Sequence, residues 1–348
     1  MDLFVNVTGG AITGASAVTD WLSDYNQCFS LGSYESNLLR AEGGLRDLQL
    51  ALLNGNGNWL LKSSAILRFL NFTEYSENSL ISLLQNKGED IDRFRRRFRN
   101  ACRKFLEGIV YHRMLLNKTP LECVPYNIGS KCKICSVALN NKLIRRMIKF
   151  AEFINRGKLC LEYNESYPFV LFLVKDLSEQ DFVKAASAYV DNFFEAISEK
   201  EIMVACHFIR VTSMPIFESK MFKKVKHIFV KRDLRDKFVS CLKHGWITED
   251  KVDEFILHHK LSKTPDWMID NNDVMVLNFE DFILNHNIIS KKILNFLGIS
   301  DGSKSDTPKY SLEWSRKNVG QWKRYPNQNI MIKLEKELKH GLYEGKSL

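Results

Sequence analysis

Residues 3–16 read LFVNVTGGAITGAS, and this stretch decides the fold. The apolar and β-branched run Leu3–Thr8 predicts a buried strand, and the segment Ser16–Tyr25 predicts a helix. The Gly-rich turn between them brings backbone N–H groups and the positive end of the helix toward one point, where an anion can bind. Thr13 and Ser16 add hydroxyl donors to this loop.

The second half of the chain alternates strands with helices. Such an alternation predicts an α/β fold, a three-layer parallel sheet with helices on both faces, which the N-terminal strand joins. We expect strands at Glu201–Phe208, Val225–Lys231 and Val274–Asn278, and helices at Leu234–His244 and at Phe279–Leu297, the last ended by Gly298.

The middle of the chain differs in character and predicts a largely helical insertion at about 54–198 in a single domain, 1–348. A helix is expected at Gly43–Leu53, another at Asp90–Asn117 and a third at Val137–Arg156. An apolar stripe at three- and four-residue steps supports the second of these. Its many arginines form either a solvated face or a wall that attracts an anionic acceptor.

The formal net charge of +9 and the pI of about 9.0 favour polyanionic partners, which include nucleic acid, acidic glycans and highly phosphorylated nucleotides. No recognisable nucleic-acid-binding module is present, so we expect no nucleic-acid partner. The N-terminus lacks a basic leader followed by an apolar stretch, and no run is long enough to span a bilayer, which predicts a cytoplasmic protein.

The eight cysteines are irregularly spaced and predict free thiols rather than a disulfide framework. Cys132 and Cys135 form a single CxxC, which Cys123 or His112 would complete as a zinc site. One such pair is weak evidence, so we expect no metal.

The loop does not match the GxxxxGK[ST] loop of nucleotide kinases and ATPases. Ala15 stands where the Lys that contacts the β- and γ-phosphates would be. This argues against a P-loop nucleotide or sugar kinase, which remains an alternative, and is compatible with a nucleotide that bears only a 5′-phosphate group.

A second anion site is expected after the strand Val225–Lys231. Arg232 lies at its carboxyl end, where open α/β sheets bind ligands, and Ser240 follows two helical turns later. The two side chains can hold one phosphate from two sides. The alternative is an ordinary strand-to-helix turn with surface charges. Asp233 and Asp236 are expected to cap and orient the helix.

At this point the chain resembles the sulfotransferases that use 3′-phosphoadenosine 5′-phosphosulfate (PAPS), and bacterial carbohydrate-type enzymes in particular. The resemblance rests on the Gly-rich loop, on RDLRD with Ser240, on Phe279-Glu280-Asp281 leading to Phe296-Leu297-Gly298, and on residues 315–323. It implies sulfuryl transfer to a hydroxyl, with PAPS as co-substrate and no metal. The implied nucleotide ligands are Gly10, Thr13, Gly14, Ala15 and Ser16 for the 5′-phosphosulfate, and Arg232, Ser240 and Arg316 for the 3′-phosphate. Lys317 is a further implied phosphate ligand without an assigned phosphate.

Two positions depart from the family pattern. The family carries Lys or Arg two residues before the loop glycine, against the bridging oxygen of the leaving group, and here Ile12 stands there. A basic residue from elsewhere must then take this role, or the protein is a degenerate, non-catalytic nucleotide-binding protein. In the C-terminal segment, Arg316 and Lys317 do not align one to one with the family's basic residues.

Two residues compete for the role of general base. Glu35 stands 21 residues after Gly14, near the place where enzymes of the family that act on glycans or tyrosine use a Glu, and His207 ends a predicted strand 25 residues before Arg232. The alternatives are a surface carboxylate and a hydrogen-bonded histidine. We prefer Glu35, because a carboxylate beside loop donors and a sulfate can have its pKa tuned. The expected acceptor is therefore a carbohydrate hydroxyl, and an anionic glycan is one candidate for it.

Overall fold

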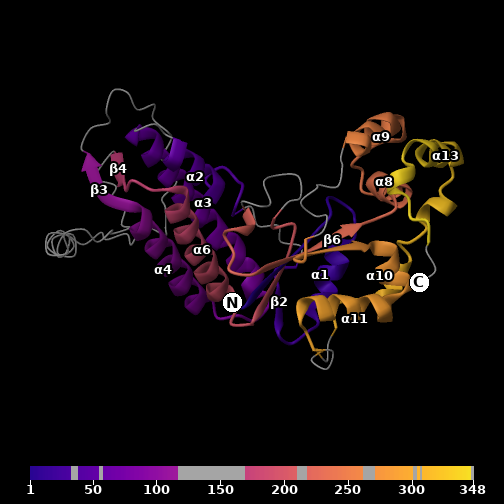
Figure 1. Cartoon of the computed structure of the whole chain (residues 1–348), viewed down its shortest axis with the longest axis horizontal. Coiled ribbons are helices and arrows are strands. Elements are labelled where there is room, and N and C mark those ends of the chain that lie inside the picture. The colour runs from indigo at the N-terminus through magenta and orange to yellow at the C-terminus, as the bar shows by residue number, and fades with distance from the viewer. Residues whose placement is uncertain are drawn as a thin grey trace. The chain divides into compact units, whose positions relative to one another are not determined.

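The computed structural model forms two compact units, comprising 1–35, 200–219 and 224–348 in the first, and 36–199 with 220–223 in the second. Figure 1 follows the chain through both of them. The residues described are 1–32, 38–54, 58–116, 169–209, 218–261, 271–300, 304–305 and 308–345.

The first unit contains a five-stranded sheet in the order β2-β5-β1-β6-β7, in which each neighbouring pair is parallel. Its strands are β1 (Leu3–Thr8), β2 (Cys28–Ser30), β5 (Ile202–Cys206), β6 (Val225–Lys231) and β7 (Val274–Asn278). The central strand β1 is buried along its whole length, which explains its almost continuous apolar run. Because the strands are parallel, their carboxyl ends meet at one edge.

Helices flank this sheet, so the first unit is a mixed α/β structure. The α-helices are α1 (Ala15–Ser23), α8 (Leu234–Lys243), α9 (Val252–Leu261), α10 (Phe279–Leu284), α11 (His286–Leu297), α12 (Leu312–Arg316) and α13 (Gln328–Glu337). The 3₁₀ turns are η1 (Glu249–Lys251), η3 (Gln321–Arg324) and η4 (Lys339–Gly341).

One face of the sheet carries the main core of the first unit. Leu3, Val5 and Val7 alternate along β1 toward this face and pack with residues of α1, α10 and α11, which lie on the same side of β6 in Figure 1. On the other face the ring of Phe4 contacts Phe208, with 5.2 Å between the ring centroids. Helices on that second face stay a prediction.

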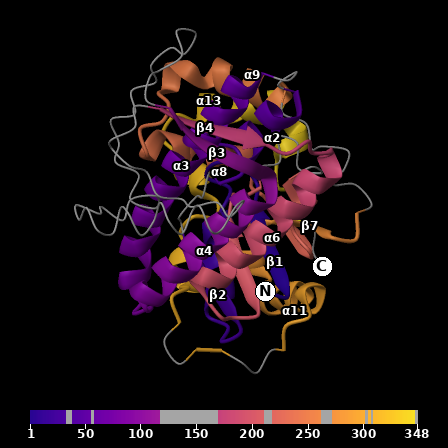
Figure 2. The same ribbon diagram turned by 90° about the vertical axis from the view of Figure 1, so that its left-hand side faces the viewer.

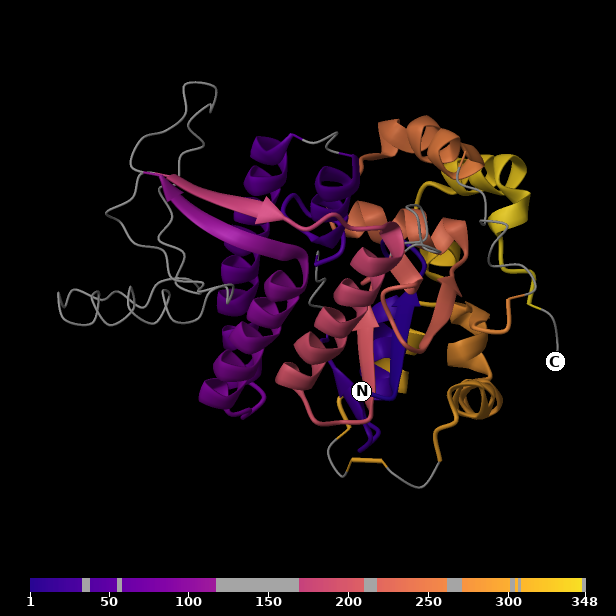
Figure 3. The ribbon, with the colours of Figure 1, turned by 60° about the vertical axis from the view of Figure 1, so that its left-hand side comes forward.

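The second unit combines helices with a hairpin. Its elements are α2 (Leu45–Asn54), α3 (Trp59–Gln85), α4 (Ile91–Ile109), β3 (Val110–Leu116), β4 (Phe169–Val174) and α6 (Glu179–Ile197). Helices α4 and α6 run side by side, and the antiparallel strands β3 and β4 extend beyond them (Figures 2 and 3). Aromatic rings join the helices, as in the stacked pair Phe105 and Tyr189, whose centroids are 5.0 Å apart.

The structure confirms the strands 3–8, 225–231 and 274–278 to the residue, and it corrects three other boundaries. The helix expected to reach Asn117 ends at Ile109, because Gly108 is a poor helix former and Val110 begins a strand that pairs with β4. The strand expected to reach Phe208 ends at Cys206, because His207 turns the backbone with a φ of 53°.

The third correction is at Phe279–Leu297, which is two helices rather than one. Asn285 leaves helical geometry with φ −111° and ψ 35°, as residues with short polar side chains often do. Gly298 ends α11 in the left-handed conformation, as expected.

The predicted insertion at 54–198 falls within the second unit. Because 117–168 lie outside the described residues, its largely helical character and the single-domain organisation stay predictions, and the helix expected at Val137–Arg156 lies outside them too.

Candidate functional site

The Gly-rich loop joins β1 to α1 at the carboxyl edge of the sheet. A Cβ at Gly9 would come within 2.0 Å of the Val230 carbonyl oxygen, and one at Gly14 within 2.2 Å of the Phe279 ring, so the loop packs tightly against β6 and α10. Gly14 also has a φ of 88°, which favours glycine. Gly10 is different: it is exposed, and of the described residues a Cβ there would meet only Lys237, whose Nζ is 4.0 Å away.

The other loop residues divide between closing the loop and beginning the helix. Thr13 is buried, and its hydroxyl donates to the Gly10 carbonyl at 3.1 Å. Ala15 is buried in the core and begins α1, while Ser16 is exposed in its first turn. The first N–H groups of a helix have no partner within it, so the N-terminus of α1 offers donors beside this loop.

Ile12 adopts the left-handed region with a φ of 58°, which is rare and strained for a β-branched residue. Its carbonyl oxygen accepts a hydrogen bond from Arg232 Nη1 at 3.1 Å. Strain of this kind persists only where the surroundings impose it, and here the arginine holds the loop carbonyl in place.

Arg232 is the residue that connects the candidate phosphate sites. It follows β6, is 9% exposed, and donates from Nη2 to the Asn318 carbonyl at 2.7 Å as well as to Ile12. Burial lowers the pKa of its guanidinium, an effect that the charges of Asp236 and Glu280 oppose. Its Nε is buried, and the described part of the chain gives it no hydrogen-bond partner.

Ser240 lies on α8, two turns after Arg232, and is buried. Its Oγ accepts a hydrogen bond from Gln321 Nε2 at 3.4 Å. Arg316 and Lys317, the basic residues predicted beside it, are both exposed at the end of α12. The backbone carbonyl of Asn318 contacts Arg232. The hydrogen bonds described for this region involve neither the Arg316 nor the Lys317 side chain.

Two acidic residues that the sequence left without a binding role hold this region together. Asp233 caps α8 as predicted, accepting from Arg235 N–H at 2.8 Å. Asp236 instead accepts from the N–H groups of Gly320 at 2.6 Å and Trp322 at 3.0 Å, and so fastens the C-terminal segment to α8. Burial raises the pKa of Asp236.

Glu280 is a third acidic residue that supports this region. It is 2% exposed, its Oε1 accepts from Asp233 N–H at 3.0 Å, and its Oε2 has no partner among the described residues. Burial raises its pKa to about 7, and the hydrogen bond from Asp233 N–H and the charge of Arg232 only partly offset this. The carboxyl group thus stabilises the turn that presents Arg232.

Of the two candidate bases, Glu35 lies outside the described residues. His207 follows β5, and its N–H donates to the Val7 carbonyl at 2.8 Å. Its Nδ1 lies 3.3 Å from the hydroxyl oxygen of Thr8, the last residue of β1. His207 is therefore at the carboxyl edge of the sheet, next to the start of the Gly-rich loop.

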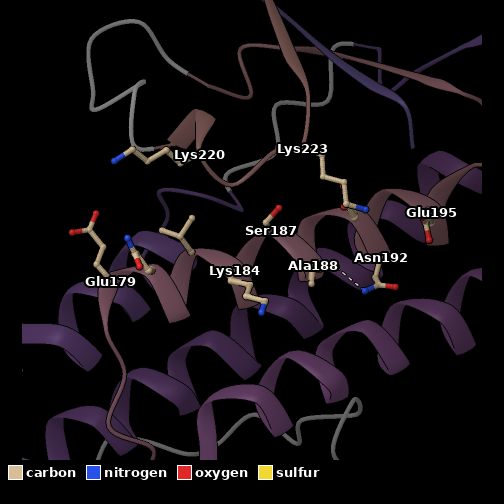
Figure 4. A pocket seen from close by; sticks show the side chains of 11 residues that line it. Glu179, Lys184, Ser187, Ala188, Asn192, Glu195, Lys220 and Lys223 are labelled. Atoms are coloured by element: carbon tan, nitrogen blue, oxygen red, sulfur yellow. Dashed lines mark hydrogen bonds and ion pairs between the residues drawn. The ribbon is translucent and has the colours of Figure 1, made fainter.

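A separate groove of about 950 Å³ lies in the second unit, along α6. Figure 4 shows Lys184 and Asn192 on the helix, with Lys220 and Lys223 from another segment across from them. Charges of both signs line it, and Lys223 Nζ pairs with Asp191 at 2.5 Å. It contains none of the residues predicted to bind the nucleotide.

The described ranges contain no group of three His, Cys, Asp or Glu side chains that could hold a metal ion, and Cys132 and Cys135 lie outside them. Cys28, Cys102, Cys206 and Cys241 are buried, and none of them forms a disulfide with another described residue. In the same ranges we find no helix with the length and apolar character needed to cross a membrane.

No protein-family model matches the chain, and neither does any curated protein. Among solved structures, the chain is similar to retinol dehydratase in complex with androsterone and the inactive cofactor PAP. The identity is 15%, the match covers 50% of this chain and 68% of that one, and the TM-score is 0.29. The function is therefore inferred from the residues of this chain.

Proposed function

We propose that the protein transfers a sulfuryl group from PAPS to an acceptor hydroxyl, in the class of carbohydrates or glycoconjugates. The observation that carries the proposal is the hydrogen bond from Arg232 to the Ile12 carbonyl. Arg232 thereby contacts the Gly-rich loop at the carboxyl ends of the neighbouring strands β1 and β6, which supports two adjacent anion sites. A nucleotide with phosphates at both its 5′ and 3′ positions is the kind of ligand that two adjacent anion sites suit.

The residues fit such a ligand in their chemistry. Gly10 leaves the open side of the loop clear, and the N–H groups around Gly14, Ala15 and Ser16 are donors for the 5′ group. Arg232 has an unpartnered Nε within the described structure, and with Ser240 it is proposed to hold the 3′-phosphate.

Arg316 and Lys317 are exposed on the segment that Asp236 fastens to α8. We keep them as proposed ligands that close over the nucleotide from that segment. Sulfuryl transfer of this kind depends on positioning and on neutralising charge, for which the donors named are sufficient and no metal is required.

The acceptor hydroxyl loses its proton to a general base, Glu35 or His207. The position of His207 beside Thr8 is compatible with this role. Glu35 remains the preferred candidate on the sequence argument, since a carboxylate there corresponds to enzymes that act on glycans.

The test is transfer of radiolabelled sulfate from PAPS to a panel of capsule, lipid-linked and small-molecule glycans. We expect labelled product with at least one glycan and release of adenosine 3′,5′-bisphosphate. Phosphoryl transfer from ATP with Mg²⁺ in place of sulfuryl transfer would favour the kinase alternative. Binding of the bisphosphate, with no transfer to any acceptor or to water, would favour a non-catalytic nucleotide-binding protein.

A further inference from the structure

One lysine that no motif assigns points at the Gly-rich loop. Lys237 lies on α8 between Arg232 and Ser240, and its Nζ is 4.0 Å from the position that a Cβ on Gly10 would occupy. Among the described residues, no other heavy atom beyond Gly10 and its two chain neighbours comes as close to that position. Since Ser240 comes three positions after Lys237 in the helix, both side chains lie on the same side of it.

Lys237 has no counter-charge in the described structure. Its ammonium forms neither a hydrogen bond nor an ion pair with any described residue, although it is partly buried. Burial lowers its pKa, the nearby thiol of Cys241 opposes this, and the charge of Arg232 lowers the pKa as well. Lys243, on the same helix, differs because it donates to Gln321.

A partly buried, unpaired ammonium destabilises a protein unless an anion neutralises it. Two cations, Lys237 and Arg232, therefore lie beside a loop that has no acidic residue of its own. The carboxyl groups of Asp236 and Glu280 act on Arg232, and Lys237 has no such partner among the described residues. The N-terminus of α1 adds partial positive charge at the same place. This combination favours an anionic ligand group at the loop.

Ile12 leaves room for this arrangement. Its side chain packs against the apolar cluster of α8, α9 and α13, so it does not cover the open side of the loop at Gly10. The sulfotransferases that the chain resembles have a Lys or Arg at this position of the loop, where this chain has the apolar Ile12. Here the ammonium of Lys237 approaches the loop from α8 instead.

Building on the proposed function, we propose that Lys237 contacts the 5′-phosphate of the nucleotide and neutralises the charge that develops on its bridging oxygen. In the transfer step a bond forms between the acceptor oxygen and sulfur while the bond between sulfur and the bridging oxygen breaks. The electron pair stays on the phosphate oxygen, and the acceptor proton goes to the general base. Lys237 keeps its own proton and contributes charge alone.

The test compares two nucleotides by calorimetry on the full chain. Adenosine 3′,5′-bisphosphate carries both phosphates, whereas adenosine 3′-monophosphate lacks the group that Lys237 is proposed to contact. The variants are Lys237→Met, which keeps the length and removes the charge, and Lys237→Arg, which keeps the charge. Lys231→Met is the matched control, because Lys231 is exposed at the end of β6.

We expect Lys237→Met to weaken binding of the bisphosphate about 10- to 100-fold, as for the loss of a hydrogen bond between charged groups, and to change the monophosphate affinity less than about twofold. Lys237→Arg should retain most of the affinity, and the control should match the wild type for both ligands. Equal bisphosphate affinity in Lys237→Met and wild type would overturn the role of Lys237 but not the proposed function. A wild type that binds neither nucleotide would overturn the proposed function, and this inference with it.

Thermal melting without nucleotide separates binding from structure. Lys237→Met should melt at or above the wild-type temperature, because it removes an unpaired ammonium from a partly buried site. A lower melting temperature, together with equal loss of affinity for both nucleotides, would assign Lys237 a structural role and contradict the proposal.

Discussion

The buried carboxyl group of Glu280 makes a quantitative prediction about stability and pH. Its pKa in the folded protein is about 7, against an ordinary value of 4.5, because burial penalises the ionised form. The native state therefore binds more protons than the unfolded state between these two values, and stability must fall as pH rises through this window. Below pH 4.5 the penalty is absent, and above pH 7 it is fully present.

The magnitude follows from the shift. A difference of about 2.5 pKa units corresponds to about 3 kcal/mol at roughly 1.4 kcal/mol per unit. Glu280→Gln keeps an acceptor for the Asp233 N–H but cannot ionise. The variant should gain up to about 3 kcal/mol relative to wild type between pH 5 and pH 8.

The assay is urea unfolding of both proteins at several pH values, with the difference in unfolding free energy plotted against pH. Taking the difference cancels the other titrating groups, such as His227, whose pKa is lowered to about 4 by burial. Glu313→Gln is the control, since Glu313 is exposed on α12. A difference between Glu280→Gln and wild type that does not change from pH 5 to pH 8 would refute the reasoning.

Three further predictions concern the site. Arg232→Ala should cost about 2–4 kcal/mol of bisphosphate binding measured by calorimetry, as expected for a charge-assisted contact, and should affect 5′-AMP less; the same loss for both nucleotides would remove Arg232 from the 3′-phosphate. Glu35→Gln should lower kcat about 10²- to 10⁴-fold with little change in nucleotide affinity, and His207→Asn should cost less; the reverse ranking in steady-state kinetics would make His207 the base and favour a small alcohol as acceptor. Sulfuryl transfer should survive EDTA, whereas a complete loss of activity that Mg²⁺ restores would indicate a P-loop kinase. If Cys132 and Cys135 bind a zinc ion, chelation should lower the melting temperature.

The sequence was sufficient to predict a strand where the strand and its ends both depend on neighbouring residues. The predicted ends of β1, β6 and β7 agree with the structure. Strand β1 ends before Gly9 and Gly10, which favour a turn, and β6 and β7 each contain a short apolar run. Strand β2, Cys28–Ser30, was missed because three residues are too few to show a pattern. The strands β3 and β4 were missed because their pairing joins Val110 to Val174, across a long stretch of chain.

The site was predictable in its motifs but not in its contacts. Arg232 stands at the end of a recognisable strand, yet its partner Asn318 lies 86 residues away. Asp236 was expected to orient α8, and nothing local indicates that it holds Gly320. Lys237 did leave a signal, because helical periodicity places it with Ser240, but only the folded loop shows that it approaches Gly10.

The central claim is that Arg232 and Ser240 form a 3′-phosphate site beside a loop that binds the 5′ group. Calorimetric titration of the wild-type protein with adenosine 3′,5′-bisphosphate and with 5′-AMP tests it most directly, with ATP and Mg²⁺ as the control. We predict that the bisphosphate binds about 30-fold more tightly than 5′-AMP or better, as for one added charge-assisted contact. Equal affinity for the two nucleotides, or tighter binding of ATP with Mg²⁺ than of the bisphosphate, would contradict the claim.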